Sequence, residues 1–120
     1  MKLKEFNSKF VYTPDRKGAD QWGIPNIEDG FIRDDCEGYA LGLRKYVDGM
    51  ENTEIYFCKF KGQGHVVSKI NGMYIDNIMK DFKGTLPKEY TDLRRLSKLN
   101  VWWRIFSTKM FGRVLFNKII

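Results

Sequence analysis

The sequence predicts a single α+β domain, and three features of the chain lead to this expectation. A helical pattern over about residues 36–47 is followed by strand-like segments between residues 55 and 78. The 120 residues are enough for one hydrophobic core and too few for two. Apolar residues make up 42% of the chain and aromatic residues 15%, which argues against a disordered protein.

The helix is predicted from a capping signal and from the spacing of apolar residues after it. Asp34 followed three positions later by Glu37 forms an aspartate variant of the capping box. Cys36, Leu43 and Val47 then recur at helical spacing on one face. Cys36 is therefore expected in the first turn of an amphipathic helix, on its buried side.

The strands are predicted over three segments, Ile55–Phe60, His65–Ile70 and Met73–Ile78. Asn71-Gly72 separates the last two and is a strong signal for a two-residue hairpin turn. Such a turn places Val67 opposite Asp76, so that Asp76 lies diagonally across from His65 on the same face of the sheet. Asn77 is expected to point to the other face.

The two ends of the chain are less regular. Residues 1–30 are rich in turn-forming residues, so we expect mostly loop with a short helical turn at most. Residues 90–99 fit either a strand or a helix. Residues 101–120 suggest an amphipathic helix in which Gly112 is a weak point. We expect a domain core over about residues 20–102 and a basic amphipathic tail over residues 103–120.

Charge and cysteine content limit the environment and the partners. The net charge of +6 favours an anionic partner, and the basic aromatic tail could bind lipid or nucleic acid or else pack against its own domain. The chain has two cysteines and no apolar stretch typical of an export signal or a membrane span. We therefore expect a protein of the cytoplasm, without a transmembrane segment.

Cys36, His65 and Asp76 together have the chemistry of a thiol-based catalytic triad. A helix N-terminus favours the thiolate, His65 is the only histidine in the chain, and Asp76 is placed to orient the imidazole. The alternative is that Cys36 is a small core residue and that His65 is a loop residue without a role. Cys58 lies within a predicted strand and is expected to be a packed thiol. Zinc binding is not favoured, because the chain has no short Cys-x-x-Cys pair.

Several segments resemble the bacterial transglutaminase-like cysteine proteinases. The matching motifs are Trp22-Gly23-Ile24-Pro25, Asp35-Cys36-Glu37-Gly38-Tyr39-Ala40, Gly64-His65-Val66-Val67 and Tyr74-Ile75-Asp76-Asn77. The family typically has Trp-x-x-Pro, Asp-Cys-Glu-Asp-Tyr-Ala, Gly-His and Leu-Asp-Asn at these places. The resemblance covers about residues 20–102. It is to the compact members of the family, which are intracellular or phage-encoded. A phage-encoded member would act in the cytoplasm of the host.

The resemblance implies a papain-like fold in which the cysteine-bearing helix packs on an antiparallel sheet. It implies that Cys36 is the nucleophile, His65 the general base and Asp76 the orienting acid. An upstream side chain, Gln21 or Trp22, would help the backbone N–H of Cys36 to stabilise an oxyanion.

The resemblance also bears on calcium, because periplasmic members of the family bind it through the carboxylates of their Asp-Cys-Glu-Asp motif. Here Asp35 and Glu37 are retained, but Gly38 replaces the second aspartate. We therefore expect no required cofactor. Asp35 and Glu37 are only weak calcium candidates, and capping of the helix is the favoured role for them.

The function expected from these residues is that of a cysteine peptidase. It would hydrolyse a peptide or isopeptide bond in a protein substrate through an acyl-enzyme, and acyl transfer to an amine would use the same intermediate. The alternative is a non-catalytic binding module of the same fold, which would use its basic aromatic tail to bind nucleic acid, lipid or protein.

Overall fold

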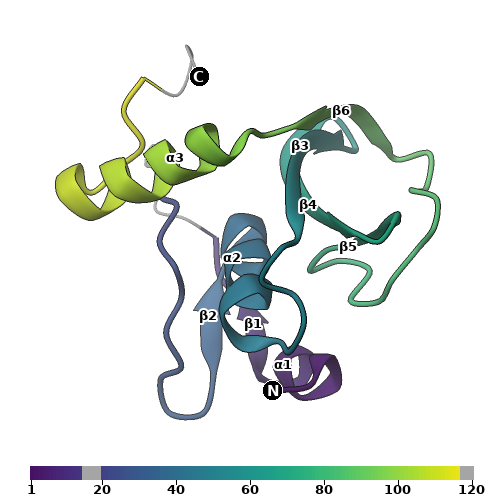
Figure 1. Cartoon of the computed structure of the whole chain (residues 1–120), viewed down its shortest axis with the longest axis horizontal. Helices are drawn as coiled ribbons and strands as arrows, with labels where there is room; N and C mark the ends of the chain where they lie inside the picture. The colour runs from purple at the N-terminus through teal and green to yellow at the C-terminus, as the bar shows by residue number, and fades with distance from the viewer. Residues whose placement is uncertain (15–19, 117–120) are drawn as a thin grey trace.

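The computed structural model describes residues 1–14 and 20–116. Its four-stranded sheet consists of β3 (Glu54–Phe60), β4 (Gln63–Ile70), β5 (Met73–Ile75) and β6 (Tyr90–Arg95). The other elements are α1 (Leu3–Lys9), β1 (Phe10–Tyr12), β2 (Ile32–Asp34), α2 (Cys36–Tyr46) and α3 (Lys98–Phe111). Helix α2 lies at the centre, between the curled sheet and the α1–β1–β2 unit (Figure 1). The prediction of an α+β fold is confirmed.

The sheet has the strand order β5-β4-β3-β6, and all neighbouring strands are antiparallel. Asn71 and Gly72 have φ angles of 51° and 76°, as a two-residue hairpin turn requires, and Ile70 pairs with Met73. The predicted hairpin is therefore confirmed, and so is its register as far as the Ser68–Ile75 pair; the predicted pairing of Val67 with Asp76 lies beyond the end of the ladder. A second turn with positive φ, at Lys61 and Gly62, joins β3 to β4.

Strand β5 ends at Ile75, so the strand predicted to reach Ile78 is too long. The cause is the side chain of Asp76. Its Oδ1 accepts hydrogen bonds from the backbone N–H groups of Ile78 and Met79, at 3.0 and 2.7 Å. These bonds turn the chain away from the ladder, as aspartate commonly does in turns.

The start of α2 differs from the predicted capping box by one residue. Asp34 is the last residue of β2 and pairs with Tyr12, so it cannot be the N-cap. Asp35 takes that role instead, because its Oδ1 accepts from the backbone N–H of Gly38 at 3.0 Å. The predicted position of Cys36 in the first turn of the helix is correct.

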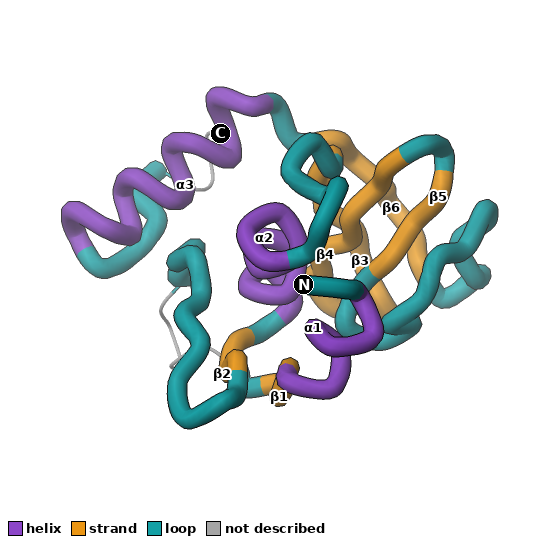
Figure 2. Tube along the Cα trace, turned by 60° about the horizontal axis from the view of Figure 1, so that its bottom comes forward, coloured by secondary structure: helices purple, strands orange, loops and turns teal. Residues whose placement is uncertain are grey.

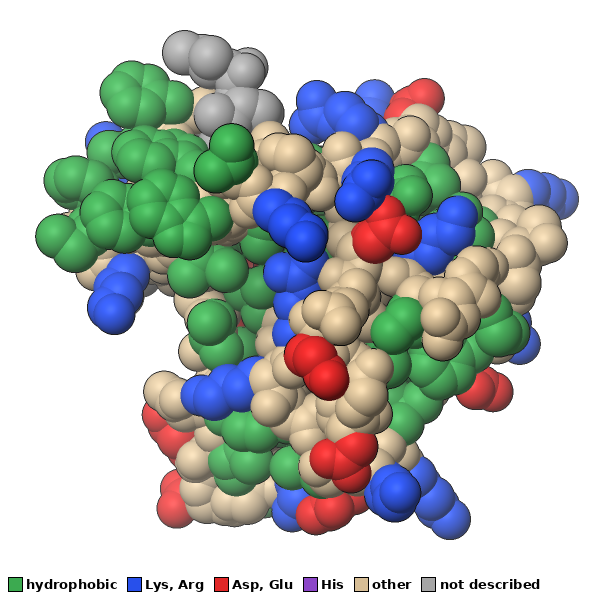
Figure 3. Space-filling view, viewed as in Figure 1, with side chains coloured by type: hydrophobic (Ala, Val, Ile, Leu, Met, Phe, Trp, Pro, Cys, Tyr) green, Lys and Arg blue, Asp and Glu red, His purple; other side chains and the backbone are tan. Residues whose placement is uncertain are grey.

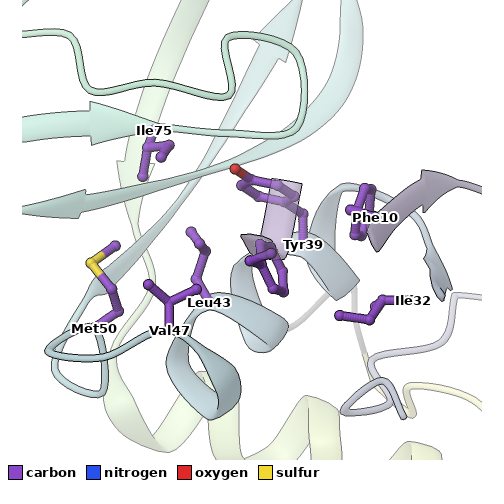
Figure 4. Close-up of a cluster of buried hydrophobic side chains, with 8 residues drawn as sticks. Phe10, Ile32, Tyr39, Leu43, Val47, Met50 and Ile75 are labelled. Atoms are coloured by element: carbon purple, nitrogen blue, oxygen red, sulfur yellow. The ribbon is translucent and has the colours of Figure 1, made fainter. Parts of the chain in front are cut away.

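Helix α2 is buried on two sides, which explains why every residue from Gly38 to Leu43 is buried. Figure 2 shows it enclosed by the sheet, α3 and the α1–β1–β2 unit. One of its sides packs into a cluster that also includes Phe6 and reaches the sheet (Figure 4); the labelled members are Phe10, Ile32, Tyr39, Leu43, Val47, Met50 and Ile75. The other side packs into a second cluster, made by Trp22, Ala40, Leu41, Ile55, Val66, Leu96, Val101 and Val114.

The elements at the start of the chain are ones that the sequence analysis did not predict. Within residues 1–30, expected to be mostly loop, the chain forms α1 and β1, and β1 pairs in parallel with β2, a strand for which no expectation was stated. Phe6 and Phe10 enter the first cluster, and Val114 enters the second. The buried core therefore extends beyond residues 20–102 in both directions.

Helix α3 begins before residue 101 and ends at Phe111, whereas the sequence predicted a helix over residues 101–120, of which 117–120 lie outside the described residues. The Ser97 side chain caps its start by accepting from the N–H of Asn100, and Gly112, with φ of 78°, ends it. Residues 90–99, which were open between strand and helix, thus form β6 and then the start of α3. Like the other helices in the described part of the chain, α3 is neither long nor apolar enough to cross a membrane.

The buried face of α3 is unusually polar. Val101, Arg104 and Ser107 are buried, and Arg104 is only 2% exposed. Its guanidinium lies 3.7 Å from a carboxylate oxygen of Asp20 and 5.1 Å from the ring centroid of Trp22, and its Nε donates to Asn100 at 2.6 Å. A buried arginine thus joins α3 to the second cluster.

We predict that Arg104→Ala lowers the free energy of unfolding by about 2–3 kcal/mol, because it removes a cation–π contact and the ion pair of a buried guanidinium with the partly exposed Asp20, and leaves a cavity. Lys109→Ala, at an exposed position on the same helix, should change it by less than about 0.5 kcal/mol. Urea unfolding of both variants measures this. Equal losses in the two would show that Arg104 does not hold α3 in place.

Candidate active site

Cys36 is the first residue of α2, and its side chain is only partly buried. Its thiol donates to Oε2 of Glu37 at 3.6 Å and makes a further hydrogen bond with the backbone of Val66. Val66 directly follows His65 on β4. The end of the helix is thus held against the strand that carries the histidine.

The surroundings of Cys36 favour the protonated thiol. Burial raises its pKa well above the ordinary value, and the nearby carboxylates of Glu37 and Asp35 raise it further. The hydrogen bond with the backbone of Val66 acts in the opposite direction but is outweighed. The resting state is therefore a thiol, and nucleophilic attack requires a base to remove its proton.

His65 and Asp76 form a buried hydrogen-bonded pair. Nε2 of His65 lies 2.7 Å from Oδ2 of Asp76, and the two residues are 7% and 1% exposed. The imidazole packs against the rings of Phe60 and Tyr90, each with its centroid 5.8 Å away, and these two rings contact each other with centroids 4.8 Å apart. Because Asp76 occupies Nε2, the ring nitrogen that remains for proton exchange with a thiol is Nδ1.

Asp76 is held by more groups than His65 alone. Besides the two turn N–H groups already described, the hydroxyl of Tyr90 donates to its Oδ2 at 2.6 Å. Burial opposes ionisation, but the hydrogen bonds from His65, the N–H of Met79 and Tyr90 outweigh it and hold the pKa of Asp76 below its ordinary value. Asp76 is therefore ionised at neutral pH.

Tyr90 is a residue of this site that the sequence analysis did not select. It lies on β6 and reaches the site because it pairs with Phe60 of β3. No local motif indicates this contact, because it depends on which strand occupies the edge of the sheet.

Cys36 and His65 open onto one pocket of about 320 Å³, lined also by Tyr12, Phe60, Gln63, Gly64, Asn77 and Ile78. The three predicted residues are thus brought together, two at the pocket and Asp76 behind the imidazole. Another pocket, of about 480 Å³, lies between Arg44, Thr53 and α3. Its lining contains neither cysteine nor histidine, so it offers no comparable chemistry.

Gln21 and Trp22, the two candidates for the oxyanion donor, do not line this pocket. Nε2 of Gln21 donates to the carbonyl of Gly112 at 3.0 Å, and Trp22 is fully buried in the second cluster. The side-chain amides on the pocket wall belong instead to Gln63 and Asn77. Asn77 was expected on the opposite face, but the strand ends before it and the alternation of side chains no longer applies.

Asp35 and Glu37, the weak calcium candidates, both accept hydrogen bonds from the chain itself. Asp35 caps α2, and Glu37 accepts from the thiol of Cys36. In the described part of the chain, no three His, Cys, Asp or Glu side chains are grouped as a metal site would require.

The space that the family's second aspartate would need at position 38 is occupied here by another side chain. A Cβ at Gly38 would overlap the carboxyl group of Asp34. Burial raises the pKa of Asp34 to about 7, and the neighbouring charge of Asp35 raises it as well, against the hydrogen bond from the N–H of Asp35. Gly38 is thus explained by packing against Asp34.

Cys58 is a packed thiol, as predicted. It is 1% exposed and lies opposite His65 in the β3–β4 ladder. Burial and the charge of Asp76 raise its pKa to about 11. It therefore remains protonated at neutral pH.

Comparisons with protein-family models, with curated proteins and with solved structures found no match for this chain. What the site can do is therefore judged from its own residues.

We predict that Glu37→Gln accelerates alkylation of Cys36 by iodoacetamide at pH 7.5, by about three- to tenfold, because removing the nearest negative charge lowers the thiol pKa. The exposed carboxylate of Glu51 supplies the control variant, Glu51→Gln, which should react at the wild-type rate. An unchanged or slower reaction in Glu37→Gln would contradict the electrostatic account of the thiol.

Proposed function

We propose that the protein is a cysteine peptidase that hydrolyses a peptide or isopeptide bond in a protein substrate through an acyl-enzyme. The observation that supports this most is the buried His65–Asp76 pair beside a pocket that also contains the helix-start thiol of Cys36. A transglutaminase-like fold accords with it, since the cysteine comes from a helix and the histidine from an antiparallel sheet packed on it. The cytoplasm is the proposed location, in accord with two free thiols.

In the first half of the proposed reaction, Nδ1 of His65 accepts the thiol proton as the sulfur of Cys36 attacks the carbonyl carbon of the substrate. Ionised Asp76 orients the imidazole and stabilises the imidazolium that forms. Collapse of the tetrahedral intermediate breaks the C–N bond, and His65 gives the proton to the departing amine. A thioester on Cys36 results.

In the second half, His65 accepts a proton from water as the water oxygen attacks the thioester carbonyl. The C–S bond breaks, the carboxylic acid leaves, and the thiol of Cys36 is restored by proton return from His65. The N–H of Cys36 at the start of α2, together with a side-chain amide of Gln63 or Asn77, would stabilise the oxyanion in both halves.

One observation favours the alternative, a non-catalytic binding module of the same fold. Burial and the carboxylates of Glu37 and Asp35 raise the pKa of Cys36, whereas many thiol enzymes lower the pKa of their cysteine. The peptidase proposal accommodates this because general-base removal of the proton needs no thiolate in the resting state. The two functions differ in whether Cys36 is acylated faster than a simple thiol.

The peptidase proposal predicts that p-nitrophenyl acetate acylates Cys36 in a burst and that the acetyl group is then hydrolysed. Cys36→Ala should abolish the burst while the protein stays folded, because the nucleophile is lost and the cavity left is small. Cys58→Ala should retain the burst, since that thiol is buried in the sheet. Stopped-flow absorbance and mass spectrometry of the acetylated peptide check both.

His65→Ala separates the two functions. For the enzyme it should slow acylation on the order of 10²-fold or more, the size of a general-base contribution. Acylation of the wild type no faster than that of a free cysteine peptide, with no effect of His65→Ala, would leave only the binding module. Loss of the burst in Cys58→Ala but not in Cys36→Ala would show that Cys58, and not Cys36, is the acylated thiol.

A further inference from the structure

Helix α3 buries polar as well as apolar side chains and leaves large apolar side chains exposed. Val101, Arg104 and Ser107 face the protein interior, whereas Trp102 and Met110 are 57% and 60% exposed. An amphipathic helix on a globular domain normally buries its apolar side. The exposed side of α3 therefore calls for a partner.

The exposed apolar residues form one continuous face. Leu99, Trp102, Phe106 and Met110 recur every three or four residues, and Leu99 is 79% exposed. The rings of Trp102 and Phe106 are stacked, with centroids 4.9 Å apart. Figure 3 shows apolar side chains gathered over α3, so the face is broad as well as continuous.

The charge of the chain is concentrated in the same segment. Residues 93–120 contain seven Lys or Arg and no Asp or Glu, a net charge of +7. Residues 1–92 contain 14 cationic and 15 anionic side chains, a net charge of −1. Of the cations on α3, Lys98 and Lys109 are exposed. They are about three helical turns apart, so both lie on the same edge of the apolar face.

We propose that this face of α3, with its flanking lysines, docks on the surface of an anionic lipid bilayer. Tryptophan and other aromatic side chains are favoured at the boundary between headgroups and acyl chains, and lysines beside them can reach the lipid phosphates. The segment's charge adds a long-range attraction to an anionic surface. The helix would lie in the plane of the bilayer surface.

Two other partners fit the face less well. Two copies of the chain would have to bring two segments of charge +7 together, which electrostatic repulsion opposes. Single-stranded nucleic acid would need open aromatic rings, but Trp102 and Phe106 are stacked on one another. Leu99 and Met110 have no aromatic ring on which a base could stack, whereas both side chains can insert among lipid acyl chains.

The test is co-sedimentation of the full chain with vesicles of phosphatidylcholine, alone or mixed in equal parts with phosphatidylglycerol. The wild type should bind the mixed vesicles and bind the neutral ones at least about tenfold more weakly. The double variant Trp102→Ser/Phe106→Ser should lose about tenfold or more in affinity for the mixed vesicles. Phe31→Ser, a similarly exposed phenylalanine outside α3, is its control and should bind as the wild type does.

A charge-matched pair completes the experiment. Lys98→Gln/Lys109→Gln should weaken binding by about fivefold for each cation removed, and Lys4→Gln/Lys88→Gln, at exposed positions elsewhere, should weaken it much less. Circular dichroism confirms that every variant is folded. Cys36→Ala should bind vesicles normally, which keeps this proposal independent of the peptidase activity.

Three results would overturn the proposal. The first is that the folded wild type does not bind vesicles. A shift of nucleic acid in a gel, together with this result, would indicate nucleic acid as the partner instead. The second is vesicle binding that the loss of Trp102 and Phe106 leaves unchanged, because charge alone would then account for it. The third is self-association in sedimentation velocity that the double serine variant abolishes, because the face would then be an interface between copies.

Discussion

The hydrogen bond between His65 and Asp76 is the interaction on which the candidate site depends. It joins β4 to the turn after β5, and both partners are almost completely removed from water. The same carboxylate ends β5 through two backbone N–H groups and ties in β6 through Tyr90. A buried carboxylate with four donors can stay ionised, and an ionised carboxylate fixes which imidazole nitrogen faces the pocket.

Helix α2 supplies the other half of the site, and its burial on two sides explains why it can position a nucleophile. Tyr39 and Leu43 anchor it in one cluster, and Ala40 and Leu41 anchor it in the other. A helix held in this way keeps Cys36 at a fixed place beside β4. Burial and the carboxylates around the thiol raise its pKa, so its reactivity depends on proton removal by His65, and nucleophile and base must act together.

What could be predicted from the sequence was the local part of the structure. The Asn71-Gly72 turn set the register that places Asp76 near His65, because a two-residue turn leaves no freedom in the pairing. The parallel pairing of β1 with β2 and the contact of Tyr90 with Asp76 join residues far apart in the chain and have no local signal. The orientation of α3 could not be predicted, for a different reason: apolar spacing identifies a helix but does not say which face is buried, and here Arg104 faces inward.

The most direct test of the account is the rate at which p-nitrophenyl acetate acylates Cys36 at neutral pH in Asp76→Asn, compared with the wild type. The asparagine keeps the shape of the side chain but loses the charge that holds His65 in its active orientation. We predict a decrease on the order of 10–10³-fold, smaller than the roughly 10⁴-fold loss in a serine triad, because a thiol gives up its proton more readily than a hydroxyl. Asp81→Asn, the same change at an exposed position nearby, should react at the wild-type rate. A folded Asp76→Asn variant that is acylated as fast as the wild type would contradict the triad.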